Sequence, residues 1–161
     1  MYNFILNPVA GRGKALKAMH KIEMYLTEKN IPYKIYRTEH PLHATSIARD
    51  ISLNSDNVIA AGGDGTLNEV LNGMQNFENC SLGIIPCGTG NDFSKFAGID
   101  KNFVAAMDII LNKPPVYTDF LKLNGKRVMN VTGMGMDVSV LERCKKNKFF
   151  KGKLQYIASL I

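Results

Sequence analysis

The stretch that decides the fold runs from residue 60 to residue 70 and reads Ala60-Ala61-Gly62-Gly63-Asp64-Gly65-Thr66-Leu67-Asn68-Glu69-Val70. A short apolar run, residues 58–61, leads into three glycines grouped around one aspartate. Thr66 then opens a segment in which apolar side chains recur at helical spacing, at Leu67, Val70, Leu71 and Met74. The stretch is therefore predicted to form a strand, a tight glycine turn and a helix that begins at Thr66.

The glycines of this turn are expected to serve two purposes. Part of the backbone is predicted to adopt positive φ, and no Cβ would stand between the backbone N–H groups and a bound anion. The following helix offers the positive end of its dipole to the same anion, so phosphate is the expected ligand class. Asp64 alone would repel phosphate, which implies a metal ion or a hydrogen-bonding role at this residue. The alternative to a phosphate-binding turn is a glycine turn with a purely structural role.

Strand and helix patterns alternate along the first two thirds of the chain. Strands are predicted at residues 2–6, 33–36, 58–61 and 82–86, and helices at residues 15–29, 42–53, 66–74 and 103–111. This alternation predicts right-handed β-α-β crossovers and an α/β fold, a Rossmann-like parallel sheet with helices on both faces.

Three loops are expected to leave the carboxyl ends of these strands. The first is Asn7-Pro8-Val9-Ala10-Gly11-Arg12-Gly13-Lys14, the second contains Asp64, and the third is a second glycine turn, Gly88-Thr89-Gly90-Asn91-Asp92. Ligands of open α/β sheets bind beyond the carboxyl ends of the strands, so the loops predict one shared site. The first loop lacks the residues of a P-loop and of a dinucleotide fingerprint.

The pattern changes after Pro114-Pro115. Residues 116–123 and 127–132 are predicted to form strands joined by a hairpin turn at Asn124-Gly125. The chain is therefore divided into a nucleotide-binding α/β domain, residues 1–115, and a β-rich domain, residues 116–161, that is expected to be incomplete. A helix is predicted at residues 138–143, and an uncapped apolar helical pattern begins at residue 154.

Composition narrows the class of protein. The chain has 161 residues, of which 45% are apolar, and no run of about 18 apolar residues that would predict a membrane span. The N-terminus lacks a signal-peptide pattern. The three cysteines show neither a zinc-site spacing nor a disulfide framework, so a cytoplasmic location is expected.

The net charge of +6 comes mainly from the last part of the chain. Residues 141–161 carry six basic residues and one acidic residue, with Phe149 and Phe150 between the lysines. Residues 143–153 are therefore a predicted contact with an anionic membrane surface, which would place the protein peripherally at a membrane. Nucleic-acid binding is not expected from this charge alone. A homodimer is left open.

Three motifs together resemble the catalytic domain of the diacylglycerol kinase family, which includes soluble bacterial lipid kinases and the sphingosine and ceramide kinases. They are Asn7-Pro8-Val9-Ala10-Gly11, Gly62-Gly63-Asp64-Gly65-Thr66-Leu67-Asn68-Glu69 and Gly88-Thr89-Gly90-Asn91-Asp92-Phe93. The likeness runs in order from residue 2 to about residue 137, where Asp119 and Gly133-Met134-Gly135-Met136-Asp137 are similar to later landmarks. The chain would then be the N-terminal part of such a domain.

This resemblance implies ATP-dependent phosphorylation of a lipid hydroxyl, with ATP and Mg²⁺ as cofactors and a lipid such as diacylglycerol as acceptor. Asp64 and Asp92 would be catalytic, and Asp64, Asp92 and Asp119 would arrange Mg²⁺ and its waters. The residues that would bind the nucleotide are Asn7, Pro8, Ala10, Gly11, Thr38, Gly62, Gly63, Asp64, Gly65, Thr66, Leu67, Asn68, Glu69, Gly88, Thr89 and Asn91.

The sequence departs from the family in one respect. The family carries its general base in a second, β-rich domain, and no residue here matches that base. Little or no lipid phosphorylation is therefore expected from this chain. Two alternatives remain at this stage: a kinase similar to NAD kinase, and a non-catalytic fragment that binds ATP or a membrane.

Overall fold

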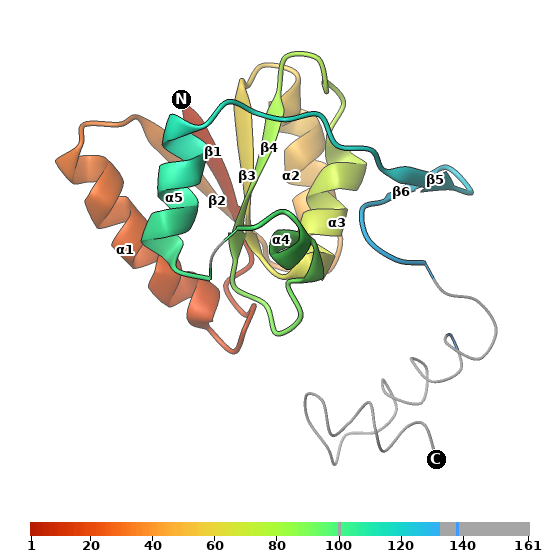
Figure 1. Ribbon diagram of the computed structural model, residues 1–161, viewed down its shortest axis with the longest axis horizontal. Coiled ribbons are helices and arrows are strands. Elements are labelled where there is room, and N and C mark those ends of the chain that lie inside the picture. Colours follow the sequence, from red (N-terminus) through yellow and green to blue (C-terminus); the bar gives the residue numbers. More distant parts are fainter. Residues whose placement is uncertain (100, 133–137, 139–161) are drawn as a thin grey trace, which may run out of the picture. The chain divides into compact units, whose positions relative to one another are not determined.

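The computed structural model describes residues 1–99, 101–132 and 138, and Figure 1 shows their arrangement. The chain divides into two compact units, Met1–Asn130 and Val131–Ile161. The first unit carries all the elements discussed below. The basic segment 143–153 and the apolar run from residue 154 lie outside the described residues, as does the helix predicted at 138–143 apart from Val138.

The first unit is built on a four-stranded parallel sheet with the order β2-β1-β3-β4. Its strands are β1 (Tyr2–Leu6), β2 (Tyr33–Arg37), β3 (Asn57–Gly62) and β4 (Ser81–Pro86). Each one matches a predicted strand to within a residue or two. The parallel sheet of the prediction is therefore confirmed.

Five helices connect or follow the strands. They are α1 (Lys14–Glu28), α2 (His43–Ser52), α3 (Asp64–Gly73), α4 (Asp92–Phe96) and α5 (Phe103–Asn112). Helix α3 begins two residues earlier than predicted, so Asp64 and Gly65 belong to its first turn. The short helix α4 was not predicted at all. None of the described helices combines the length and the apolar character that a bilayer crossing requires.

Helices cover both faces of the sheet, as predicted, because alternate residues of each strand point to opposite sides. In β3, Ile59 and Ala61 pack against α1 and α5. Val58 and Ala60 of the same strand pack against α2 and α3 on the other side. Figure 1 shows α1 and α5 together on one face and α2 and α3 together on the other. This arrangement confirms the Rossmann-like α/β fold.

The strand order creates a topological switch point between β1 and β3. The chain leaves β1 toward β2 through α1, and it leaves β3 toward β4 through α3, which lies on the opposite face. The two loops therefore diverge and leave a crevice at the carboxyl edge of the sheet. Open α/β sheets bind their ligands at such a point.

A small antiparallel hairpin follows α5. Its strands are β5 (Leu121–Leu123) and β6 (Lys126–Val128), joined at Asn124-Gly125. Both turn residues have positive φ, 48° and 78°, as a tight hairpin turn requires, so the predicted turn is confirmed. The strands are shorter than predicted, since residues 116–120 do not pair. The hairpin belongs to the first compact unit, and the division into two domains at residue 115 stays a prediction.

Candidate active site

The two glycine turns meet at the carboxyl edge of the sheet. β3 and β4 are neighbours, and the N–H of Cys87 donates to the carbonyl oxygen of Gly62 at 2.7 Å. A Cβ built on Gly88 would lie 2.6 Å from the Cα of Gly63. No side chain fits between the two backbones. The sequence prediction that both turns lie on one edge is confirmed.

The reason for the glycines differs from the prediction in one respect. None of the glycines from Gly62 to Gly65 has positive φ, so the expectation of a left-handed backbone in this turn is wrong. Space is the constraint instead: a Cβ on Gly62 would collide with the side chain of Thr66, and one on Gly63 would lie 3.0 Å from the Cα of Gly88. Within the three loops, the left-handed positions lie in the first loop, at residues 11–13, and at Asn91.

A hollow of about 260 Å³ opens where the three loops converge. Its walls come from the first loop, from the start of α3 and from the β4 loop, and they consist of Asn7, Ala10, Gly11, Gly63, Gly65, Thr66, Glu69 and Gly88. The volume is below the range of roughly 300–1,000 Å³ that is typical for complete ligand pockets. The hollow therefore has room for a small group such as a phosphate rather than for a large ligand.

The N-terminus of α3 lies at this hollow, where Gly63, Gly65 and Thr66 form part of the wall. The first hydrogen bond of the helix is made by the N–H of Leu67, which donates to the carbonyl oxygen of Gly63 at 3.0 Å. The N–H groups of residues 64–66 therefore precede the helical ladder, and Gly63 provides no side-chain cap. Together with the helix dipole, these donors make the hollow favourable for an anion.

The first loop is fixed against the other two. The side-chain amide of Asn7 donates to the hydroxyl of Thr66 at 3.1 Å, and the N–H of Asn7 donates to the carbonyl oxygen of Ala61 at 3.0 Å. Gly11, which has a φ of 59°, lies so close to the carbonyl oxygen of Cys87 that a Cβ there would overlap it. The loop thus closes one side of the hollow.

Asp64 connects the two glycine turns. Its Oδ1 accepts hydrogen bonds from the N–H of Asp92 at 2.8 Å and from the N–H of Phe93 at 3.4 Å, so it caps the N-terminus of α4 from another element. Its Oδ2 lies beside Gly90, where a Cβ would be 2.8 Å away. The sequence analysis gave two alternatives for Asp64, a hydrogen-bonding role and a metal-binding role, and the structure shows the first.

Asp92 is exposed and forms an ion pair with Lys95, whose Nζ lies 3.0 Å from Oδ1. Within the part of the chain that the structure describes, no three His, Cys, Asp or Glu side chains gather as a metal site. Asp119 is exposed on the segment before β5 and is not brought together with Asp64 and Asp92 as a third ligand. A pair of carboxylates nevertheless fits Mg²⁺, which proteins usually hold through one or two carboxylates together with substrate phosphates and water.

Asn91 supports the second turn from inside. It is only 3% exposed, its Oδ1 accepts from the N–H of Gly88 at 2.8 Å, and its amide donates to the carbonyl oxygen of Gly88 at 2.9 Å. Its φ of 52° is one that Asn tolerates better than most side chains. Asn91 therefore shapes the loop and does not line the hollow.

The remaining predicted residues take different places. Leu67 is buried in the core between α2, α3 and the sheet, and Asn68 is exposed on the outer side of α3. Thr38 follows β2, where its N–H donates to the carbonyl oxygen of Leu6 at 2.9 Å. Pro8 and Thr89 lie in the surrounding loops without lining the hollow. A nucleotide role for these residues stays a prediction.

Two neighbours of the carboxylates were not predicted from the sequence. Lys95 pairs with Asp92 because both lie on α4, the helix that the sequence analysis missed. The amide of Asn130 donates to Oδ1 of Asp64 at 3.3 Å. The two residues of this second pair are 66 positions apart in the chain, and no local pattern links them.

The cysteine behind the second turn is inert. Cys87 is 2% exposed, and burial raises the pKa of its thiol from 9.0 to about 12. Burial and the charge of Asp56 raise the pKa of Cys80 to about 11. Because the reactive species is the thiolate, neither residue is suited to nucleophilic chemistry near neutral pH.

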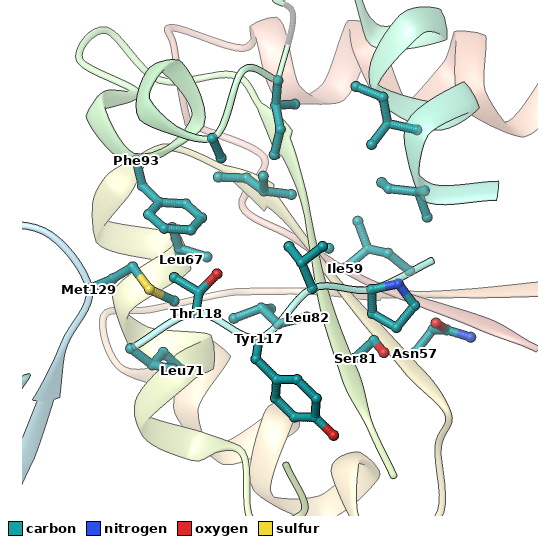
Figure 2. Close-up of a pocket in the computed structure, with 18 of the residues that line it drawn as sticks. Asn57, Ile59, Leu67, Leu71, Ser81, Leu82, Phe93, Tyr117, Thr118 and Met129 are labelled. Atoms are coloured by element: carbon teal, nitrogen blue, oxygen red, sulfur yellow. The ribbon is translucent and has the colours of Figure 1, made fainter. Parts of the chain in front are cut away.

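A second and larger pocket, of about 740 Å³, lies on the other side of α3 (Figure 2). Figure 2 shows Leu67, Phe93 and Met129 gathered at one end, with Asn57 and Ser81 at the other. Its walls are mainly apolar, and they run along β4, the edge strand of the sheet. Apolar walls make this pocket less suitable for phosphates than the glycine-lined hollow.

The fold and the hollow define a class: a Rossmann-like α/β domain with a glycine-lined hollow at the switch point of its sheet. Comparison with known families agrees, since the profile of the diacylglycerol kinase catalytic domain matches residues 1–123. The chain therefore belongs to the diacylglycerol kinase catalytic domain family, a family of lipid kinases.

Relatives and solved structures give the same result. The chain is 35% identical over 155 residues to a diacylglycerol kinase of Staphylococcus saprophyticus, covering 94% of this chain and 51% of that one. It is 34% identical over 134 residues to a diacylglycerol kinase of Bacillus subtilis, covering 81% and 44%. The crystal structure of a diacylglycerol kinase from Bacillus anthracis covers 78% of this chain and 47% of its own, with 33% identity and a TM-score of 0.69. The chain spans about half the length of the curated relatives it matches.

Proposed function

We propose that the glycine-lined hollow binds the phosphates of ATP together with Mg²⁺, and that the chain provides the nucleotide-binding part of a lipid kinase. The observation that carries the proposal is the meeting of Gly63 and Gly88 beside the free N-terminal donors of α3. Bare backbone at that point lets a phosphate approach the N–H groups closely.

The proposed reaction is transfer of the γ-phosphoryl group of ATP to the hydroxyl of a lipid such as diacylglycerol. Phosphoryl transfer needs positioning and neutralisation of charge more than covalent chemistry from the protein. The backbone donors of α3 would position the phosphates, and Asp64 and Asp92 would hold Mg²⁺ through its waters. Bound Mg²⁺ would neutralise charge on the phosphates. The names of the relatives favour a lipid acceptor over NAD.

The other predicted partners remain proposals. The anionic membrane contact was assigned to residues 143–153, which lie outside the described residues, and homodimer formation is equally open. The general base that the family resemblance assigns to a second domain has no counterpart identified in this sequence. We therefore propose that this chain binds ATP but transfers its phosphoryl group to lipid only weakly.

Titration of the chain with ATP at fixed Mg²⁺ tests the nucleotide part of the proposal. Asp64→Asn is the informative variant, because an asparagine Oδ1 can still cap α4 while the negative charge is removed. We expect wild type to bind and Asp64→Asn to lose most of the Mg²⁺-dependent affinity. Equal binding by both proteins would move the site elsewhere. Strong formation of labelled phosphatidic acid by the 161-residue chain would refute the proposed weak transfer.

A further inference from the structure

Among the described residues, Asn130 is the one hydrogen-bond partner of the Asp64 carboxylate that lies outside the two glycine turns and the start of α4. Its side-chain amide donates to the same Oδ1 atom that accepts from the N–H groups of Asp92 and Phe93. Three donors thus converge on one carboxylate oxygen. Among the described residues none donates to the other oxygen, Oδ2, which lies beside Gly90 at the edge of the second turn. The carboxylate is therefore held in one orientation with a second oxygen available.

Asn130 lies close to Asp64 because Arg127, three residues earlier, is hydrogen-bonded to α3. The backbone N–H of Arg127 donates to Oδ1 of Asn72 at 2.8 Å, and the amide of Asn72 donates back to the carbonyl oxygen of Arg127 at 2.8 Å. The guanidinium donates to the carbonyl oxygens of Leu71 at 2.9 Å and Met74 at 2.8 Å. These bonds fix β6 at the C-terminal end of α3.

Residues 127–130, which we call the α3 brace, then run from that end of the helix to the other. Arg127 contacts the last turn of α3, Met129 lines the apolar pocket with Leu67 and Leu71, and Asn130 contacts Asp64 in the first turn. The ten residues of α3 span about 15 Å, and three extended residues span about 10 Å. With its side chains added, the brace is long enough to contact both ends of the helix.

We propose that Asn130 is a positioning residue of the phosphoryl-transfer site, because it orients the carboxylate of Asp64. The hydrogen bonds of Arg127 to α3 hold Asn130 within hydrogen-bonding distance of that carboxylate. The inference rests on the proposed function, because it gives the orientation of Asp64 a purpose in holding Mg²⁺ and its waters. It adds a residue that the motifs of the sequence do not contain. It also links the hairpin β5–β6 to the anion site through defined hydrogen bonds.

The first test is the Mg²⁺ dependence of ATP binding in Asn130→Ala, Asn130→Gln and wild type. Loss of one hydrogen bond to this partly buried carboxylate should raise the Mg²⁺ concentration at half-saturation about 3- to 10-fold in Asn130→Ala. Asn130→Gln keeps an amide donor on a flexible side chain and should recover part of this loss. Asn79→Ala, a change at an exposed asparagine just before β4, at the opposite end of that strand from the site, is the matched control and should behave as wild type. An unchanged Mg²⁺ dependence in Asn130→Ala overturns the inference while leaving ATP binding itself intact.

A second test needs no nucleotide. Thermal unfolding of Asp64→Asn, Asn130→Ala and the double variant measures whether the two side chains are coupled. We expect the Tm loss caused by Asn130→Ala to shrink in the Asp64→Asn background, since the charged acceptor is then gone. Additive losses would overturn the pairing. If wild type failed to bind ATP at all, the proposed function would fall, and this cycle would still decide whether Asn130 holds Asp64.

Discussion

Gly63 and Gly88 are constrained by each other more than by their own backbone angles. Their Cα atoms lie so close that neither position leaves room for a methyl group, although neither residue has positive φ. The sequence predicted a glycine-rich site but gave the wrong reason for the glycines of the first turn. A close approach between residues 25 positions apart has no signature in a local motif, whereas the glycine spacing itself does.

Gly88→Ala should therefore damage the site by pushing the two turns apart. The new Cβ would lie 2.6 Å from the Cα of Gly63 and 2.7 Å from Oδ1 of Asn91, so backbone must move. Overpacking of this kind typically costs about 1–3 kcal/mol. We expect chemical denaturation to show that loss and ATP affinity to fall with it. Thr89→Ala, at the exposed neighbouring residue, should leave the free energy of unfolding close to the wild-type value; a similar loss there would contradict the assignment to backbone contact.

The buried thiols predict how stability depends on pH at the alkaline end. The pKa values of Cys87 and Cys80 are raised to about 12 and about 11 in the folded protein, while both thiols ionise near 9 once unfolded. The unfolded chain therefore loses these protons first, and the free energy of unfolding should decline as pH rises from about 9 toward 12. Urea midpoints across that range measure the decline.

The control is Cys87→Ala in a Cys144→Ser background, which should flatten part of this alkaline decline. Thiol reagents at pH 8 should also react slowly with native Cys80 and Cys87 in that background. Rapid modification of either thiol in the folded protein would show that the site is more open than the structure indicates.

Helix α3 carries the site at one end and its main anchor at the other. The N-terminus of α3 lines the hollow, whereas its C-terminal carbonyl groups accept from Arg127, which lies outside the helix and beside the rings of Phe77 and Phe120. The last turn of α3 contains no basic residue of its own, so Arg127 is the cation that complements this end of the dipole. The helix is thus held at both ends by contacts that its own sequence does not reveal.

Arg127→Met should loosen this anchor. The change removes charge-assisted hydrogen bonds to Leu71 and Met74 while keeping much of the apolar side chain against Phe77. Because Arg127 is only half-buried, a loss of about 1–3 kcal/mol is expected, which corresponds to a few degrees or more in Tm. Calorimetry measures it. Arg127→Lys should recover only part, since it lacks the planar fork. If Lys126→Met on the same strand proved equally harmful, the hydrogen bonds of Arg127 would not be the cause.

Elements with clear periodicity were predictable, and those defined by tertiary contacts were not. The four sheet strands and the helices α1, α2 and α5 follow from apolar spacing to within a residue or two. Helix α4 has five residues and is capped by Asp64 from another element, so its start has no local signal. Residues 116–120 alternate weakly like a strand, but four of them line the apolar pocket instead of pairing.

At the scale of the whole molecule, the shared edge of the three loops was predictable from the alternation of strands and helices, whereas the strand order that makes the switch point comes from the structure. Alternating strands and helices predict the parallel sheet, and the glycine loops then share one edge. The partnership of Asn130 with Asp64 was not predictable, because it depends on where the hairpin packs. The relatives are about twice as long as this chain. The described residues therefore correspond to only part of those proteins.

The central claim is that bare backbone at the start of α3 binds the phosphates of ATP, and Gly65→Ala tests it most directly. Gly65 lines the hollow, and a Cβ built there meets no atom within 4 Å, so the variant should fold normally. Replacing a helical glycine by alanine should even raise the free energy of unfolding by up to about 1 kcal/mol.

The decisive measurement is a calorimetric titration of Gly65→Ala and wild type with ATP and Mg²⁺, with Tm recorded for both. The methyl group would stand between the phosphates and the N-terminal donors of α3, so we predict an unchanged or higher Tm and affinity reduced by about tenfold or more, which corresponds to about 1.4 kcal/mol. Equal affinity in a normally folded variant would contradict the account.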